Sequence, residues 1–217
     1  MIVAMLASML VQWMLTSRFS KYSGVPSPYG LTGADIARKM LSDNGITDVS
    51  VQHVPGMLTD HYNPATKVVN LSDEVYSGAS IAAAAVAAHE CGHVLQHATG
   101  YAPLKMRTAL VPVVSFSSMT VQWVILAGVF LINVIPAVFW FGIAMFAVTT
   151  LFSIITLPVE INASMRAVGW LQASGITDEY TRPMAVDALK WAALTYVIAA
   201  LSSLATLLYY IGLGNRR

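Results

Sequence analysis

Residues 89–93 read His-Glu-Cys-Gly-His, an H-E-x-x-H motif whose side chains can act together on a metal ion. Side chains four positions apart lie on one face of a helix, so His89 and His93 can bind a single Zn²⁺. Glu90 lies beside them and can hold a water molecule and take its proton. The alternative is a helix with two incidental histidines, but the preceding segment Ile81–Ala88 has no polar side chain, and unliganded ionisable groups there would be costly. The motif therefore predicts zinc-dependent hydrolysis with Glu90 as the general base.

A catalytic zinc usually has three protein ligands and one open position, so the motif needs a third ligand. Glu160 is the first charged residue after the 52 uncharged residues 108–159. Two membrane crossings within that stretch would return the chain to the side that holds His89 and His93. We therefore expect Glu160 to complete the site; the alternative is an interfacial glutamate paired with Arg166.

Other residues fit the third position less well. His97 follows His89 by eight residues, or about 12 Å along a helix axis, so it cannot bind the same ion and is expected to be a polar residue near the helix end. Gln96 and Thr99 stand where a metzincin motif requires Gly and His, which excludes that class. If Glu160 is not a ligand, the remaining candidates are Asp60, Glu74, Asp178 and Glu179.

The distribution of charge predicts a membrane protein. Of the 217 residues, 56% are hydrophobic and 11% are charged, against about 25% charged residues in soluble domains. No charged residue occurs in 1–17, 108–159 or 191–215. A spanning helix needs about 20 apolar residues, so these stretches allow one, two and one crossings. The predicted spans are Ile2–Thr16, Val111–Leu131, Ala137–Leu157 and Trp191–Ile211.

The same figures exclude several classes of protein. The composition is wrong for a disordered or fibrous chain, and a single cysteine excludes a disulfide scaffold. A net charge of +1 argues against a nucleic-acid-binding protein. A cleaved signal peptide is the alternative for residues 2–16, but that segment has no basic start and no small-residue cleavage site.

The charged blocks predict one water-facing domain of mixed α and β structure. Thr32 can cap a helix over Gly33–Asp43, and Gly45 can end that helix in a left-handed turn. Val49, Val51 and Val54 alternate as on a strand. A hairpin is expected from Met57–Tyr62 and Lys67–Leu71 around the loop 63–66.

Helices make up the rest of the prediction. An alanine-rich helix begins at Ser77 or Ser80 and reaches about His97, and a further helix covers Glu160–Ala173 after a break at Pro158. The expected fold is a mainly α membrane protein with about four transmembrane helices and a small α+β catalytic domain. The predicted division is 1–17 as an anchor, 18–110 as the catalytic domain, 111–157 as a transmembrane hairpin, 158–190 as the third-ligand helix and connector, and 191–213 as the last transmembrane helix.

Several segments resemble the bacterial membrane neutral zinc metallopeptidases of the YugP type, which are similar in plan to the HtpX proteases and CAAX prenyl endopeptidases among the gluzincins. The resemblance covers nearly the whole chain from Gly33 onward. It is carried by Met57–Pro64, Val69–Ser72, Ala87–Gln96, Tyr101–Pro103, Leu157–Ser164 and Ala192–Tyr196.

The resemblance implies an integral-membrane zinc metalloendopeptidase, with His89, His93 and Glu160 as zinc ligands and Glu90 as the base. Many gluzincins have an aspartate four residues after the third ligand, where this chain has Ser164. The residue that orients the histidines is therefore sought among three candidates. These are Asp60, Asn162 and Ser164.

We expect a peptide substrate to lie along an exposed strand edge near Lys67–Leu71. His61 and Tyr196 are candidate oxyanion donors, and Asp60 with His61 is a candidate substrate contact or a structural part of the hairpin. Cys91 is expected to be a small packing residue.

The expected partners are a peptide or protein substrate, membrane proteins included, and the lipid bilayer, with no nucleic acid. The excess of lysine and arginine beside the spans predicts a multi-pass protein of the bacterial inner membrane with a cytoplasmic active site; Arg216 and Arg217 argue weakly the other way. An inactive zinc-binding scaffold is an alternative function. A site-2-type intramembrane protease is another, although no aspartate lies in a predicted span. A transporter would need ionisable residues inside its spans, which these lack.

Overall fold

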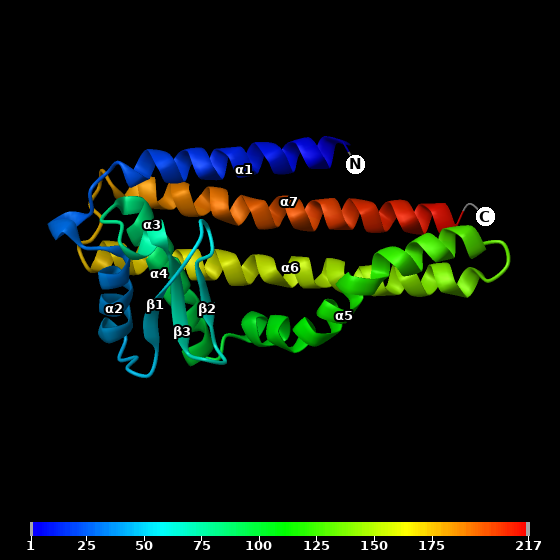
Figure 1. The fold of residues 1–217 in the computed structure, drawn as a ribbon, viewed down its shortest axis with the longest axis horizontal. Helices are drawn as coiled ribbons and strands as arrows, with labels where there is room; N and C mark the ends of the chain where they lie inside the picture. Colours follow the sequence, from blue (N-terminus) through cyan, green and yellow to red (C-terminus); the bar gives the residue numbers. More distant parts are fainter. Residues whose placement is uncertain (1, 216–217) are drawn as a thin grey trace. The chain divides into compact units, whose positions relative to one another are not determined.

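The computed structural model describes residues 2–215 and divides into two compact units (Figure 1). Among the described residues, the first unit contains 2–8, 102–158 and 195–215, and the second contains Met9–Tyr101 and Val159–Leu194. Arg216 and Arg217, which enter the orientation argument, lie outside the described residues. The helices are α1 (Ile2–Ser23), α2 (Gly33–Asp43), α3 (Asp73–Tyr76), α4 (Ile81–Ala98), α5 (Ala102–Leu131), α6 (Pro136–Ala173) and α7 (Arg182–Gly214), with a short 3₁₀ helix at Pro28–Gly30. The strands are β1 (Ser50–Val54), β2 (His61–Asn63) and β3 (Val68–Ser72).

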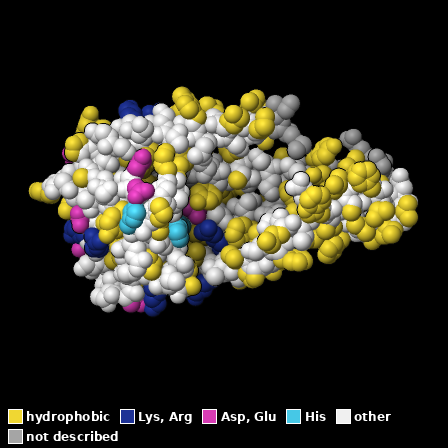
Figure 2. Space-filling view, viewed as in Figure 1, with side chains coloured by type: hydrophobic (Ala, Val, Ile, Leu, Met, Phe, Trp, Pro, Cys, Tyr) yellow, Lys and Arg dark blue, Asp and Glu magenta, His cyan; other side chains and the backbone are white. Residues whose placement is uncertain are grey.

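Within the described residues, three helices are long and apolar enough to cross a membrane, namely α5, α6 and α7. In the first unit, side chains such as Trp123 and Phe130 are 70% and 79% exposed, and hydrophobic side chains cover this surface (Figure 2). Such a surface suits lipid rather than water. Gly128 allows α5 to approach α6, because a Cβ there would lie 2.5 Å from the Phe139 Cα.

The segment predicted as the first span is helical in α1, which continues to Ser23. Its apolar part, Ile2–Thr16, has 15 residues, fewer than the roughly 20 that a bilayer requires. A fourth span therefore stays a prediction, whereas three are supported by both length and composition.

The expected helix break at Pro158 is wrong, because α6 runs through this proline without interruption. Proline removes one N–H and crowds the preceding turn, but helices in an apolar environment tolerate it where neighbouring groups compensate. The predicted third span and the predicted third-ligand helix are consequently one continuous element, so Glu160 lies within a turn of Pro158.

The second unit confirms most of the predicted local structure. Thr32 forms a capping box with Asp35 at the start of α2, and Gly45 has a left-handed φ of +70°. Ser80 caps α4, which packs its alanines against α2 in a core where most of them are fully buried.

The sheet has the order β1-β3-β2, with β1 parallel and β2 antiparallel to β3. The predicted hairpin is present, with Tyr62 opposite Val69. The predicted free edge at Lys67–Leu71 is wrong, since β3 is the central strand and bonds on both sides. The sequence pattern predicts the hairpin of β2 and β3, but it does not show that β1 pairs with β3. The edge strands of the sheet are therefore β1 and β2.

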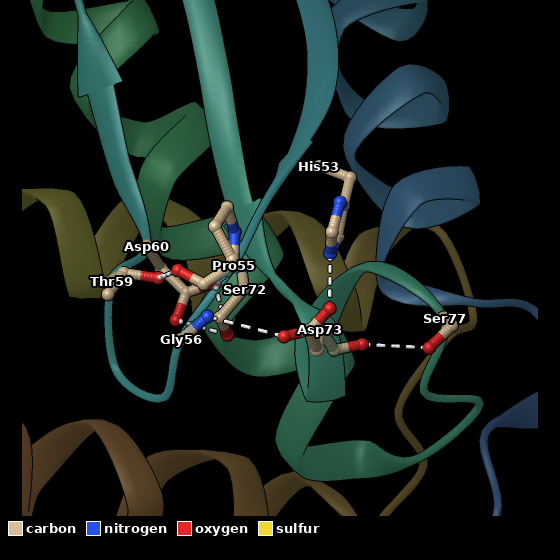
Figure 3. A network of polar contacts seen from close by, with 8 residues as sticks. All are labelled: His53, Pro55, Gly56, Thr59, Asp60, Ser72, Asp73 and Ser77. Atoms are coloured by element: carbon tan, nitrogen blue, oxygen red, sulfur yellow. Dashed lines mark hydrogen bonds and ion pairs between the residues drawn. The ribbon is translucent and has the colours of Figure 1, made fainter.

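The chain between β1 and β2 must cross the end of β3, and a polar network holds this crossing (Figure 3). The Asp60 carboxylate accepts hydrogen bonds from the Ser72 amide, at 2.8 Å, and from the Ser72 hydroxyl. Asp73 accepts from the Gly56 amide and contacts the His53 ring. Burial raises the pKa of Asp60 despite these bonds. The network fixes where the edge strand β2 begins.

Candidate metal centre

Three side chains of the second unit converge on a point where a cation could sit. Nε2 of His89 and of His93 lie 3.3 and 3.6 Å from Oε2 of Glu160. One ligand atom from each residue lies within 4.8 Å of the others, and no other group of three or more His, Cys, Asp or Glu does so among residues 2–215. The Glu160 side chain is 3% exposed and both imidazoles are 13% exposed.

The convergence depends on a close approach between α4 and α6. A Cβ on Gly92 would lie 2.6 Å from the Ala163 carbonyl oxygen, so only glycine allows the two backbones to approach this closely. Glu160 is one helical turn before Ala163 and therefore faces the same helix. The Gly in the middle of the motif is thus part of what positions the third carboxylate.

Each imidazole is held through its Nδ1 atom, which leaves Nε2 directed toward Glu160. Ser164 Oγ lies 3.1 Å from Nδ1 of His89, and Oε1 of Gln96 lies 3.1 Å from Nδ1 of His93. Since Gln96 Oε1 can only accept, Nδ1 of His93 carries the proton there and Nε2 has a free lone pair. Metal-binding histidines are typically oriented in this way.

Gln96 is a site residue that the sequence argument missed. Its side chain is fully buried, and its Nε2 donates to the Val159 carbonyl at 2.7 Å and to Asn162 Oδ1 at 3.0 Å. It therefore joins His93 to the helix that carries Glu160. The available signal was a glutamine three residues after His93, on the same helix face as both histidines.

Gln96→Leu should weaken zinc binding about 10- to 100-fold, the range for loss of a residue that orients a ligand. The leucine fills similar volume but gives His93 no acceptor. Zinc affinity measured by competition with a chelator tests this, and Gln52→Leu on exposed β1 is the matched control. Equal affinities for Gln96→Leu and the unaltered protein would remove Gln96 from the site.

Glu90 lies beside the cluster and is 8% exposed. Its Oε2 accepts a hydrogen bond of 3.0 Å from the Tyr62 backbone amide on β2. Because that amide bonds Glu90, it does not bond β3, and this side of β2 faces the site. The edge strand nearest the centre is therefore β2.

The centre attracts positive charge. Burial disfavours the imidazolium form of His93, but the hydrogen bond that this form donates to Glu160 and the charges of Glu90 and Glu160 outweigh burial and raise the pKa of His93. A zinc ion would meet two imidazole nitrogens and a carboxylate oxygen, the ligand types that Zn²⁺ prefers. The residues present therefore fit a zinc ion with an open coordination position.

The three candidates for orienting the histidines have different positions. Ser164 contacts His89. Asn162 acts indirectly, since its Oδ1 accepts from Gln96 and from Arg166. Asp60 bonds Ser72 and so supports the sheet rather than a histidine. Arg166 bonds Asn162, so its alternative pairing with Glu160 is not observed.

His61 and Cys91 do not belong to the His89, His93 and Glu160 cluster. The His61 ring is held by the Thr59 carbonyl and Asn70, on the sheet face opposite the buried Val69. Tyr196 belongs to the first unit, and its role as an oxyanion donor stays a prediction. Cys91 is buried against the Ala37 carbonyl, and burial raises its pKa, as expected of a packing residue.

Comparison with known proteins agrees with this geometry. The chain is 43% identical over 212 residues to the "Putative membrane protease YugP" of Bacillus subtilis (strain 168), covering 97% of this chain and 92% of that protein. No solved structure matches. A family profile described as "Putative neutral zinc metallopeptidase" matches residues 1–215. The chain therefore belongs to this zinc metallopeptidase family, whose metal suits the His89, His93 and Glu160 cluster.

Proposed function

We propose that the protein is an integral-membrane zinc metalloendopeptidase of the gluzincin type. His89, His93 and Glu160 hold the zinc ion and Glu90 is the general base. The observation that carries this proposal is the approach of the Glu160 carboxylate on α6 to both motif imidazoles on α4, although Glu160 follows the motif by more than 60 residues. A helix with two incidental histidines would have no reason to meet a buried carboxylate there.

Bound zinc supplies Lewis acidity, which polarises the peptide carbonyl and acidifies a water molecule. Glu90 takes a proton from the attacking water as its oxygen bonds to the carbonyl carbon. The C–N bond then breaks, and Glu90 passes the proton to the leaving nitrogen. The Tyr62 amide holds one Glu90 oxygen in place, so the other oxygen is available for this transfer.

We propose that β2, the strand that carries Tyr62, also binds the peptide substrate. On the free side of β2 the Tyr62 amide is bonded to Glu90, and the Tyr62 carbonyl is the other main-chain group directed away from β3. An extended peptide can add to such an edge through main-chain hydrogen bonds, whatever its side chains. We assign substrate binding to β2 in place of the central strand β3.

The test is peptide hydrolysis by the purified protein before and after zinc removal. Cleavage of a casein-type substrate should stop on chelation and return when zinc is restored. A protein that binds zinc and never cleaves would be a scaffold, which contradicts the proposal.

The active site is proposed to face the cytoplasm in the bacterial cell membrane. Ten of the 12 lysines and arginines occur in residues 18–190, several of them beside span ends. In intact cells, Lys67→Cys should resist an impermeant thiol reagent, while Asn133→Cys in the α5–α6 turn should react. Cys91 is buried and adds little background. The reverse labelling pattern would place the site outside.

A further inference from the structure

A groove of about 450 Å³ lies between α6 and α7 within the second unit. The two helices are antiparallel because residues 174–181 alone connect them. The groove's apolar lining comes from Ile161, Met165 and Val168 on α6 and from Val186, Leu189 and Ala193 on α7.

The only charged side chains that line the groove are positive, Arg182 and Lys190. Neither forms a side-chain hydrogen bond or ion pair with any other described residue. Asp187, three residues before Lys190, is already bonded to Tyr22 and Arg18. Near Arg182, Asp178 accepts hydrogen bonds from Thr181, and Glu179 forms no ion pair with the arginine among the described residues. Two cations without acidic partners beside an apolar lining suit a ligand that is both apolar and anionic.

The position of the groove along the chain links it to the bilayer. The charge-free stretch 108–159 ends just before Ile161, and the stretch 191–215 begins just after Lys190. The end of the groove at Ile161 and Ala193 is therefore its membrane end. Arg182 is eight residues from Lys190, so it lies about 12 Å further from that end along α7.

Exposed apolar side chains extend beyond the predicted spans and along this groove. Ile161, Met165 and Val186 are 46%, 67% and 40% exposed. Gly169 adds open space, since a Cβ there would have no atom within 4 Å. A monomeric water-facing surface rarely leaves such a strip uncovered.

We propose that this groove binds an anionic phospholipid. The phosphate of the lipid bonds Arg182. One acyl chain of the lipid lies along the apolar lining and continues past Ala193 into the bilayer. Lys190 packs its methylene stem beside the chain and directs its ammonium group toward the lipid headgroups. Ser164 lines the same groove and contacts His89, so the lipid would pack on the helix that supplies Glu160. The proposal does not depend on peptidase activity.

Lipid binding is measured by native mass spectrometry of the full-length protein titrated with phosphatidylglycerol or with phosphatidylcholine. Phosphatidylglycerol should bind more tightly. Arg182→Gln should weaken that binding about fivefold, with a smaller effect for Lys190→Gln. Lys39→Gln on α2, which removes a cation already paired with Asp43, should change nothing.

Gly169→Leu tests the apolar part, because the leucine would occupy the groove without a clash. It should reduce phosphatidylglycerol binding while zinc content stays the same. Gly212→Leu is the matched control, a helical glycine that also has open space around it and lies outside the groove. Equal binding of the two lipids, or unchanged binding by Gly169→Leu, overturns the proposal. If Gly169→Leu left lipid binding unchanged but slowed the cleavage of an apolar peptide, the groove would belong to the substrate. That result would also overturn the proposal.

Discussion

Glu90→Gln is expected to lower the rate of peptide hydrolysis by about 10³-fold or more while the protein still binds zinc. The amide keeps the size of the carboxylate and can still accept the hydrogen bond from the Tyr62 amide. It cannot take a proton from water or give one to the leaving nitrogen, so both proton transfers are lost. Hydrolysis rate and zinc content are measured on the same purified sample.

Glu74→Gln is the matched control for this change, because Glu74 lies on α3 outside the metal cluster. It should leave both zinc content and hydrolysis unchanged. A zinc-loaded Glu90→Gln protein that cleaves peptide at the unaltered rate would remove Glu90 from the role of base.

Glu160→Gln is expected to weaken zinc binding and hydrolysis together. A neutral amide oxygen is a poorer partner for a divalent cation than a carboxylate, and the two imidazoles alone leave the ion incompletely bound. The loss of zinc affinity should exceed the 10- to 100-fold that follows removal of a supporting residue such as Gln96. Chelator competition gives the affinity, and initial rates at saturating zinc show whether activity recovers.

The control for Glu160→Gln is Glu179→Gln, which removes an exposed carboxylate in the connection between α6 and α7. That change should affect neither property. Unaltered zinc affinity in Glu160→Gln would show that the third ligand is another residue.

The local structure of the second unit could be predicted because its signals are local. Thr32, Gly45 and Ser80 act within one turn of their own helix, and their roles follow from residue type and spacing. The pairing of β1 with β3 could not be predicted, because the two strands are parallel and no short turn connects them. Pro158 misled because its effect depends on whether surrounding groups compensate for the missing N–H.

In the site too, local sequence signals could be predicted and contacts between distant segments could not. The spacing of His89 and His93 and the isolated charge of Glu160 were visible in the sequence, and the structure brings these three side chains together. The contribution of Gln96 was not visible, because a glutamine is exposed in most contexts and its role depends on a contact with Val159 across two helices. Ser164 was one of three candidates, and only the distance to His89 selects it.

Titration of zinc into metal-free protein, with peptide hydrolysis followed at each step, tests the central claim most directly. We expect no hydrolysis without zinc and a rate that rises in proportion to bound zinc until each chain holds a single ion. Hydrolysis by the metal-free protein, or full zinc occupancy without hydrolysis, would contradict the proposed zinc peptidase.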